Sequence, residues 1–423
     1  NAMFGIDAKT TLDLPVLTDA LNTLPFLSTK EKSTLTLQGE AAMVMPGESS
    51  KTSTIPSDGG ESIAYLDDFE GSRIFIPLQT SYTVWRLASV PNRLPDNPTV
   101  GNDSLMNTQR AKLDWYNLPI TSLSDRTVRV DDIWPEKSVA REDQRVTVLD
   151  LDYYPTRRGP FNYQPDLAQQ RENWAGVMRL LPSNASNLID GNFNYIELWM
   201  KVENQSGGKL IIDLGKVSED VIPNGKLNSE DDVLPGSIRN GILNAGEDVG
   251  LDMLTDEQER QLFANEIAQG LIPADDPSGD NYVYDANDWT RFNGTQGNGD
   301  QENGDPAGQF PDTEDLNNNS ILDLANDYYR YIIDLDTTRF NDPSNRNPYV
   351  VGGGTNGWYQ FRIPLNLPDE EVGTPALDNV EFLRVLISGV ESANPDTPLN
   401  VRIAEFNFVG NQWYERLRSE ERR

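Results

Sequence analysis

The stretch NYIELWMKV at residues 194–202 alternates apolar side chains with others that include Glu197 and Lys201. A period of two residues is the pattern of a β-strand that buries one face. The stretch WYQFRIPL at residues 358–365 has the same period. Because each strand offers a single apolar face, two sheets packed face to face are predicted. The apolar positions are Ile196, Leu198, Met200 and Val202 in the first strand, and Tyr359, Phe361, Ile363 and Leu365 in the second.

From residue 62 onward the chain consists of short β runs separated by long loops rich in Pro, Gly, Asn and Asp. That pattern is typical of an all-β sandwich and differs from the alternation of strands and helices in a parallel sheet. The sequence therefore predicts a mainly β protein. The candidate strands lie at residues 64–69, 82–88, 145–153, 174–181, 194–202, 209–214, 328–334, 358–365, 380–387 and 400–408.

The N-terminal residues 4–58 contain a short predicted helix at residues 17–24, with Thr18 as its candidate cap, and an alternating stretch at residues 33–45. Two interpretations of this stretch stay open. It is either an ordinary half-buried strand or a strand in or near a membrane barrel, because lipid-facing strands alternate in the same way. Its apolar face holds Leu35, Leu37, Ala41, Met43 and Met45.

The negative charge of the chain is concentrated in one segment. Residues 218–327 hold 25 Asp and Glu against 4 Lys and Arg, a net charge of −21 out of −32 for the whole sequence. Non-specific nucleic-acid binding is driven by Lys and Arg, so we expect no nucleic-acid partner. Cations, basic surfaces or neutral sugars are expected instead. The absence of Cys and His from the sequence excludes disulfides, thiol chemistry and the commonest zinc ligand.

The ends of the chain carry no targeting pattern. No run of about 18 apolar residues and no charged-then-apolar N-terminus occurs, so neither a transmembrane helix nor a signal peptide is predicted. The opening Asn1-Ala2-Met3 resembles the remnant of an expression vector. We therefore expect an excised piece of a longer protein.

Three related motifs recur inside the acidic segment: NGKLN at residues 224–228, NGILN at 240–244 and NSILD at 319–323. Short Asp and Asn side chains on a tight turn converge on one point, as the six to eight oxygen ligands of Ca²⁺ require. Structural Ca²⁺ is therefore the predicted cofactor. Seven and eight residues after each first Asn stand the pairs Asp231 and Asp232, Glu247 and Asp248, or Asn326 and Asp327.

The third motif comes closest to a known calcium loop. Asp315, Asn317 and Asn319 take positions 1, 3 and 5 of an EF-hand loop, and Asp323 takes position 9. Ser320 replaces the turn Gly and no Glu stands at position 12, so the loop is more similar to those of dockerin-like and extracellular repeat modules. The alternative is a set of solvated Asn-Gly turns flanked by acids. The predicted ligands in this segment are Asn224, Asp231, Asp232, Asn240, Asn244, Glu247, Asp248, Asp252, Asp315, Asn317, Asn319, Asp323 and Asp327.

One helix is predicted within the acidic segment. Thr255-Asp-Glu-Gln258 is a capping box, which predicts a helix at residues 256–268 with Leu262 and Ile267 facing inward. Residues 270–311 have little apolar content. A loop of that length is either pinned or disordered, and calcium is the predicted pin.

The sequence lacks the usual catalytic constellations. A Ser-His-Asp triad is impossible without His, and no Gly-x-Ser-x-Gly or phosphate-binding glycine loop occurs. Paired carboxylates leave a glycosidase as an alternative. The acids cluster with Asn and Gly as in metal sites, however, so a non-enzymatic protein is predicted. Aromatic residues are either sugar-stacking platforms or core: Trp85, Trp115, Tyr116, Trp134, Tyr153 and Tyr154.

Two stretches bracket the predicted sandwich. They are DDFE at residues 67–70 and RIAEFNFV at residues 402–409, the second followed by Trp413. Together they resemble the ends of a carbohydrate-binding, galactose-binding-like jelly roll. In that family the opening acids and an acid on the last strand often hold structural Ca²⁺. The resemblance covers residues 60–215 and 328–413, and it implies a further calcium site at Asp68, Glu70 and Glu405.

A second resemblance runs in order through nearly the whole sequence. Its motifs are GEAAMVMPG at residues 39–47, AYLDDFEG at 64–71, YYPTRRGPFNY at 153–163, WAGVMR at 174–179, NYIELW at 194–199, LGKVSED at 214–220 and PDTED at 311–315. They are similar to the SprA/Sov family, the giant outer-membrane proteins of gliding motility and type 9 secretion in Bacteroidetes. This likeness raises the barrel interpretation of residues 33–45 to equal standing with the other.

The SprA/Sov resemblance implies a water-exposed part of a protein-conducting channel, on the cell-surface side of the outer membrane. The implied function is a non-enzymatic structural domain that helps to cap or line the channel. The implied partners are the rest of the translocon barrel, accessory outer-membrane secretion proteins and exported cargo, and the fragment itself is expected to be soluble. A calcium-stabilised carbohydrate-binding or adhesin module is the alternative.

The predicted organisation combines these inferences into a jelly-roll β-sandwich with a long, loop-rich acidic insertion. Residues 1–58 form an N-terminal segment, and residues 59–216 and 328–413 form the sandwich. Residues 217–327 form the calcium-loop-like insertion, and residues 414–423 form a charged tail.

Overall fold

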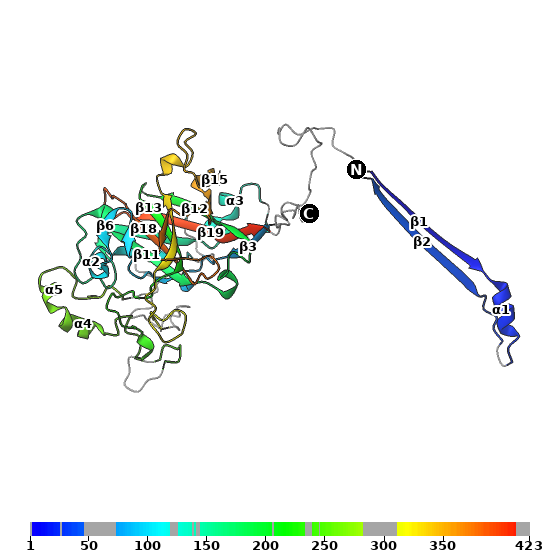
Figure 1. Cartoon of the computed structure of the whole chain (residues 1–423), viewed down its shortest axis with the longest axis horizontal. Helices are drawn as coiled ribbons and strands as arrows, with labels where there is room; N and C mark the ends of the chain where they lie inside the picture. The colour runs from blue at the N-terminus through cyan, green and yellow to red at the C-terminus, as the bar shows by residue number, and fades with distance from the viewer. Residues whose placement is uncertain are drawn as a thin grey trace, which may run out of the picture. The chain divides into compact units, whose positions relative to one another are not determined.

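The computed structural model divides the chain into two compact units, Asn1–Gly71 and Ser72–Arg423, which we describe separately (Figure 1). None of the helices in the described part is long and apolar enough to cross a membrane. The strand predicted at residues 64–69 lies outside the described residues, as do Asp68 and Glu70. The structure describes residues 2–25, 28–45, 73–118, 126–137, 139–140, 144–204, 207–232, 239–244, 246–281 and 311–411.

The first unit is a long antiparallel hairpin of β1 (Ala2–Asp13) and β2 (Thr34–Met45), joined through α1 (Pro15–Asn22). The strand predicted at residues 33–45 is present as β2. The helix begins earlier than predicted because Pro15 stands in its first turn, where its missing N–H costs nothing. Thr18 does not cap the helix, and its hydroxyl accepts a hydrogen bond from the Ser33 N–H at 2.8 Å.

The second unit is built on two antiparallel sheets, which confirms the prediction of a mainly β protein. Sheet I has the order β15-β16-β12-β19-β10-β7, with β3 also paired to β19, and sheet II has the order β17-β14-β13-β18-β11-β4. In Figure 1 the red strand β19 runs through the middle of the unit, near β12 and β3.

The strands of sheet I are β15 (Val350–Gly353), β16 (Tyr359–Pro364), β12 (Phe193–Glu203), β19 (Leu399–Asn411), β10 (Leu149–Arg158), β7 (Ala111–Tyr116) and β3 (Arg73–Pro77). Those of sheet II are β17 (Glu370–Val372), β14 (Asp327–Asp334), β13 (Lys209–Lys216), β18 (Phe382–Ser388), β11 (Trp174–Leu180) and β4 (Arg86–Leu87). The smaller elements are β5 (Arg93–Leu94), β6 (Asn97–Val100), β8 (Val128–Arg129), β9 (Arg145–Val146), α2 (Asp103–Thr108), α3 (Val130–Ile133), α4 (Asp256–Leu262) and α5 (Ala264–Ala268).

Three apolar clusters form the layers of the second unit. The largest lies between the sheets, where Leu198 of sheet I and Ile212 of sheet II are fully buried. A second cluster covers the outer face of sheet II and includes Val90 and Met106, and a third, around Trp358, covers the outer face of sheet I. The inner faces therefore follow the predicted period of two, whereas outer-face residues are buried by loops and short helices.

The strands differ from the prediction at three places. Residues 82–88 form a 3₁₀ turn at Tyr82–Val84 and only the two-residue strand β4, because the Tyr82 N–H donates to Asn117 Oδ1 at 2.7 Å. The edge strand β7 was not predicted, although Ala111, Leu113 and Trp115 alternate along it and pack in the central cluster. Residues 145–153 divide between β9 and β10.

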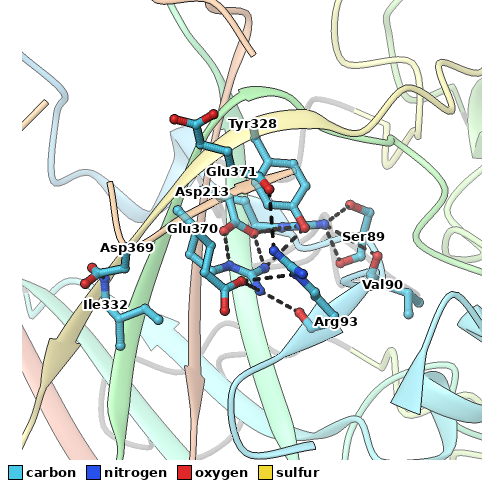
Figure 2. A network of polar contacts seen from close by, with 11 residues as sticks. Ser89, Val90, Arg93, Asp213, Tyr328, Ile332, Asp369, Glu370 and Glu371 are labelled. Carbon is cyan, nitrogen blue, oxygen red and sulfur yellow. Dashed lines mark hydrogen bonds and ion pairs between the residues drawn. The ribbon is translucent and has the colours of Figure 1, made fainter. Parts of the chain in front are cut away.

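An ion network is buried on the outer face of sheet II (Figure 2). Asp213 lies between Arg330 and Arg384, with Arg330 Nε 2.6 Å from Oδ1 and Arg384 Nη2 2.7 Å from Oδ2, and all three side chains are fully buried. Arg330 also donates to the Arg93 carbonyl at 2.6 Å, and Arg384 donates to Ser89 Oγ at 3.1 Å. The network thus holds the loop that contains Ser89 and Arg93 against sheet II.

Candidate metal centre

The acidic segment, residues 218–327, runs from the end of β13 to the first residue of β14, and these two strands are neighbours in sheet II. Lys216 is paired with Asp327, so the chain leaves the sheet and returns to it at adjacent positions. Arg110 donates from Nη2 to the Val221 carbonyl at 2.6 Å, and the Phe161 N–H donates to the Ser278 carbonyl at 2.7 Å. These contacts anchor the segment to the sandwich, and Figure 1 shows α4 and α5 together on the outside of the unit.

The three repeated motifs form the same turn. At the second residue of each motif the backbone is left-handed, a conformation that L side chains rarely adopt. The side-chain oxygen of the first Asn accepts a hydrogen bond from the N–H two residues later, at 2.7 to 2.8 Å in all three copies. The φ angles are +66° at Gly225, +70° at Gly241 and +62° at Ser320.

One carboxylate closes each turn by accepting two backbone N–H groups. Asp315 accepts from Asn319 and Ser320, both at 2.8 Å. Asp231 closes the second turn, accepting at 3.0 and 2.7 Å. Asp220 closes the first turn, accepting at 3.4 and 3.1 Å. Asp220 was not among the predicted ligands, although it stands four residues before Asn224 as Asp315 stands before Asn319.

The remaining predicted ligands of the third motif divide into two groups. Asp323 lies within the turn, where its Oδ2 accepts from the side-chain amides of Asn317 at 2.9 Å and Asn319 at 3.0 Å. Asp327 belongs to β14, and its Oδ1 accepts from the Thr374 N–H at 2.8 Å. The structure therefore brings Asp323 to the predicted loop and places Asp327 against a different part of the chain.

The other predicted ligands are spread over the segment and the sandwich. Glu247 is fully buried and its Oε2 accepts from the backbone and side chain of Asn244, at 2.9 and 2.8 Å. Asp248 is half-buried. The side chain of Asp232 lies outside the described part. Glu405 stands opposite Trp199 in the pairing of β12 with β19, on sheet I and apart from the turns.

Three buried glutamates that were not among the predicted ligands join parts of the segment through hydrogen bonds. Glu314 accepts the N–H groups of Val221 and Ile222, at 2.8 and 2.9 Å, and of Asn228 at 2.8 Å. Glu230 accepts three amides in the same way, from residues 249, 250 and 312. Glu219 accepts two, from residues 316 and 323. Distant loops are therefore joined through single carboxylates.

Burial dominates the electrostatics of these glutamates. Desolvation raises the pKa of Glu219 to about 7, that of Glu314 to about 8 and that of Glu230 to about 9, against an ordinary value of 4.5. The amide hydrogen bonds oppose the rise but do not cancel it. Negative charge in this segment is therefore costly unless a cation offsets it.

A group of three acids meets the distance requirement for a metal ion. One carboxylate oxygen each of Asp252, Glu259 and Asp280 lies within 4.8 Å of the others. Of these, only Asp252 was selected from the sequence. Among the described residues this is the group of three acids close enough to share one ion.

The helix that carries Glu259 is rotated relative to the prediction. The capping box between Thr255 and Gln258 is present, but the helix breaks at Phe263 into α4 and α5. Phe263 stacks on Tyr163 with ring centroids 3.8 Å apart. Leu262, predicted to face inward, is 62% exposed, and Glu259 is fully buried instead. The spacing of apolar residues could not predict which side of the helix is buried, because the buried residue, Glu259, is an acid.

The aromatic residues considered as sugar platforms are mostly core. Trp85, Trp115, Tyr116, Tyr153 and Tyr154 are all at most 5% exposed. Trp134 is half-buried and packs edge-on against Trp199, with ring centroids 5.6 Å apart. These side chains fill the sandwich and its outer layers.

One protein family matches the chain. A family model, SprA_N, described as a motility related/secretion protein, matches residues 264–419, which run from α5 beyond the end of β19. No curated protein matches the chain. The matched range includes the third repeated motif and the last strands of both sheets. This match supports membership of the chain in the SprA family of motility-related and secretion proteins.

Proposed function

We propose that this chain is a non-enzymatic, extracellular structural domain of an SprA-like translocon, located at the outer membrane, which helps to cap or line the export channel. The observation that carries the proposal is the family match over residues 264–419. Accessory secretion proteins and exported cargo are the partners that this role requires. The buried acids of the segment support a structural role, because they hold backbone amides that join distant loops.

The connectivity of the second unit supports a jelly-roll sandwich of the galactose-binding type. The chain crosses between the sheets from β10 to β11, β11 to β12 and β12 to β13. It crosses again from β14 to β15, and from β16 to β17 and from β18 to β19. Repeated crossing of this kind builds both sheets together and leaves long loops at the ends of the sandwich.

The hairpin of the first unit supports attachment to a larger assembly. The pairing of β1 with β2 sets Leu12 opposite Leu35, and these residues and Leu37 are 47%, 42% and 51% exposed. A two-stranded hairpin is marginally stable by itself in water. We propose that the rest of the translocon covers this apolar face.

Calcium is proposed to stabilise the three repeated turns, with the carboxylates that close them and Asp248, which follows the second motif, as ligands. We expect Ca²⁺ to raise the melting temperature of the chain relative to EDTA. A site held at 100 times its Kd contributes about 2.7 kcal/mol, which corresponds to several degrees in a chain of this size. Asp315→Ala combined with Asp248→Ala should remove most of that difference.

The matched control for this calcium test is Asp275→Ala, which removes an exposed acid of the same segment. It should leave the calcium effect intact. If wild-type melting is indifferent to EDTA, or if the double variant keeps the full effect, calcium does not bind at these turns.

The translocon role is tested by removing the acidic segment in cells. Because Lys216 and Asp327 are paired, residues 218–325 are replaceable by a short Asn-Gly turn that keeps β13 beside β14. In a gliding bacterium that carries this change in its own copy, we expect the protein to reach the surface while cargo export and gliding are lost. Normal export with the shortened protein at the surface would contradict the proposal, and Asp275→Ala is the control.

Carbohydrate binding remains the second candidate because of one groove on sheet I. The groove has a volume of about 310 Å³, and its lining includes Arg73, Phe75, Glu405 and Asn407. Phe75 is 59% exposed and offers a ring for sugar stacking. The chain would be assigned to this function instead by two results together. The cells with the shortened protein would export cargo normally, and the chain would bind a glycan array in a way that Phe75→Ala abolishes.

A further inference from the structure

The carboxylates of Asp252, Glu259 and Asp280 come from three different pieces of the acidic segment. Asp252 lies just before α4, Glu259 lies on α4, and Asp280 follows α5 by a loop. One oxygen of each lies within 4.8 Å of the others. Oxygen ligands bind Ca²⁺ at about 2.3–2.6 Å, so opposite ligands of one ion are up to roughly 5 Å apart. The three groups are therefore spaced for a single ion.

Two of these three acids have carboxylate oxygens that lack donors. Glu259 and Asp280 are both fully buried, yet Glu259 Oε1 and both carboxylate oxygens of Asp280 accept no hydrogen bond. Buried carboxylates are normally satisfied by donors, by an ion pair or by a metal. The nearby Arg158 does not fill this role with hydrogen bonds to the acids, since its guanidinium donates to the carbonyls of Pro277 and Asp276.

The surrounding contacts hold the three carboxylates in place. Asp252 Oδ2 accepts from Tyr163 Oη at 2.8 Å and from Ser278 Oγ at 2.5 Å. The Ser278 N–H donates to Glu259 Oε2 at 3.0 Å, which leaves Oε1 free to face the other acids. Asp276 Oδ1 accepts the Asp280 N–H at 3.1 Å and so fixes the turn that presents Asp280.

The backbone beside Asp280 is also shaped for a close approach. Gly250 has a φ of +81°, and a Cβ at this position would lie 2.0 Å from Asp280 Oδ2. Only glycine therefore leaves room for the carboxylate. Glu230 fixes this loop, because its Oε2 accepts the Gly250 N–H at 3.0 Å.

We infer that Asp252, Glu259 and Asp280 form a calcium site separate from the three repeated turns. A donor set of carboxylates suits a hard cation, and the sequence has no Cys or His to select a softer metal. Ca²⁺ is favoured over Mg²⁺ because both oxygens of Asp280 are free for bidentate binding, and Ca²⁺ accepts irregular coordination of this kind. The ion joins α4 to the loops on either side of it.

The test uses the full chain, freed of metal with EDTA and titrated with Ca²⁺ by calorimetry, and with Tb³⁺ under excitation of tyrosine. Tyr163 touches Asp252, so Tb³⁺ at this site should luminesce strongly. Asp280→Asn and Glu259→Gln should each remove one bound ion or weaken its binding at least tenfold. The matched control is Glu257→Gln, an exposed acid on the same helix, which should bind as wild type does.

Asp280→Asn has a second expected effect that a purely structural aspartate would not produce. Because it removes a buried charge without donors, the variant should melt at a higher temperature than the wild type in EDTA and at a lower temperature in excess Ca²⁺. If Asp280→Asn and Glu259→Gln bind Ca²⁺ with wild-type stoichiometry and affinity, the site does not exist.

Two further outcomes keep the site distinct from the repeated turns and from the translocon role. Should Asp280→Asn fail to fold, Glu259→Gln and Gly250→Ala take its place, since both are expected to lose the same ion. Loss of the calcium effect in the Asp315→Ala and Asp248→Ala variant, with Asp280→Asn behaving as wild type, would support the turns and overturn this inference. Ca²⁺ should displace Tb³⁺ from the site, and Mg²⁺ at the same concentration should not. Equal displacement by the two ions would contradict the choice of Ca²⁺.

Discussion

Asp213→Ala is expected to lower the free energy of unfolding of the second unit by roughly 3–5 kcal/mol, the cost of leaving a buried charge without its partner. Two guanidinium groups, those of Arg330 and Arg384, would lose their shared carboxylate while fully buried. Tyr328, whose ring centroid lies 5.3 Å from one guanidinium carbon and 5.1 Å from the other, cannot replace a negative charge. Urea unfolding at pH 7 measures the change.

The pKa of Asp213 fixes the sign of its pH dependence. Burial opposes ionisation, but Arg330 and Arg384 outweigh it and hold the pKa below the ordinary value of 3.8. A lowered carboxylate pKa contributes stability above the unfolded-state value, and that contribution is lost as the pH falls through the folded-state value. The decrease in the free energy of unfolding caused by Asp213→Ala should therefore be complete at pH 7 and should become smaller only in strong acid.

Two controls separate the buried network from ion pairs in general. Asp396→Ala removes an exposed partner of Arg157 and should change stability by at most about 1 kcal/mol. Asp213→Leu combined with Arg330→Met and Arg384→Leu replaces all three charges with apolar groups of similar size, and should recover much of the loss. Equal effects of Asp213→Ala and Asp396→Ala would show that the network contributes little.

In EDTA, the stability of the chain is expected to fall as the pH rises from about 5 to about 9. Burial raises the pKa of Glu314 to about 8 and that of Glu230 to about 9, from 4.5 in the unfolded chain. A raised carboxylate pKa contributes stability that is complete below the unfolded-state value and is lost as the pH rises through the folded-state value. Both shifts act in the same direction and each pKa unit corresponds to about 1.4 kcal/mol, so the loss is expected to be large relative to the stability of an ordinary domain.

The measurement is urea unfolding at several pH values, with and without Ca²⁺. Asp280→Asn should make the EDTA curve less steep, because it removes one of the buried acids whose pKa is raised. Glu257→Gln, on the exposed face of α4, should leave the slope unchanged. Stability that rises between pH 5 and 9 in EDTA would mean that the backbone amide donors, and not burial, control these carboxylates.

The strands of the central sheets could be predicted from the sequence because apolar residues occupy every second position. The strands predicted at 194–202, 209–214 and 358–365 are present as β12, β13 and β16, each with its apolar side in the central cluster. The pattern failed where the outer faces are also covered. In β18, for example, the polar residue Arg384 is as buried as its apolar neighbours, because loop residues lie over that face.

The repeated turns could be predicted from the sequence because each depends on neighbouring residues. An Asn followed by Gly or Ser sets both the side-chain hydrogen bond and the left-handed residue within four positions. The carboxylate that closes the turn was only partly accessible. Asp315 and Asp220 stand four residues before the Asn, but Asp231 stands nine residues before Asn240.

What the sequence by itself determined is local: the period of two that builds the sheets, the repeated turns, the capping box at Thr255 and the family likeness. Only the tertiary structure decided which acids meet. Asp252, Glu259 and Asp280 are separated by up to 28 positions, and Asp213, Arg330 and Arg384 by up to 171. The physical reason is that backbone hydrogen bonding and side-chain periodicity act over a few residues, whereas a buried charge finds its partner through the packing of the whole fold.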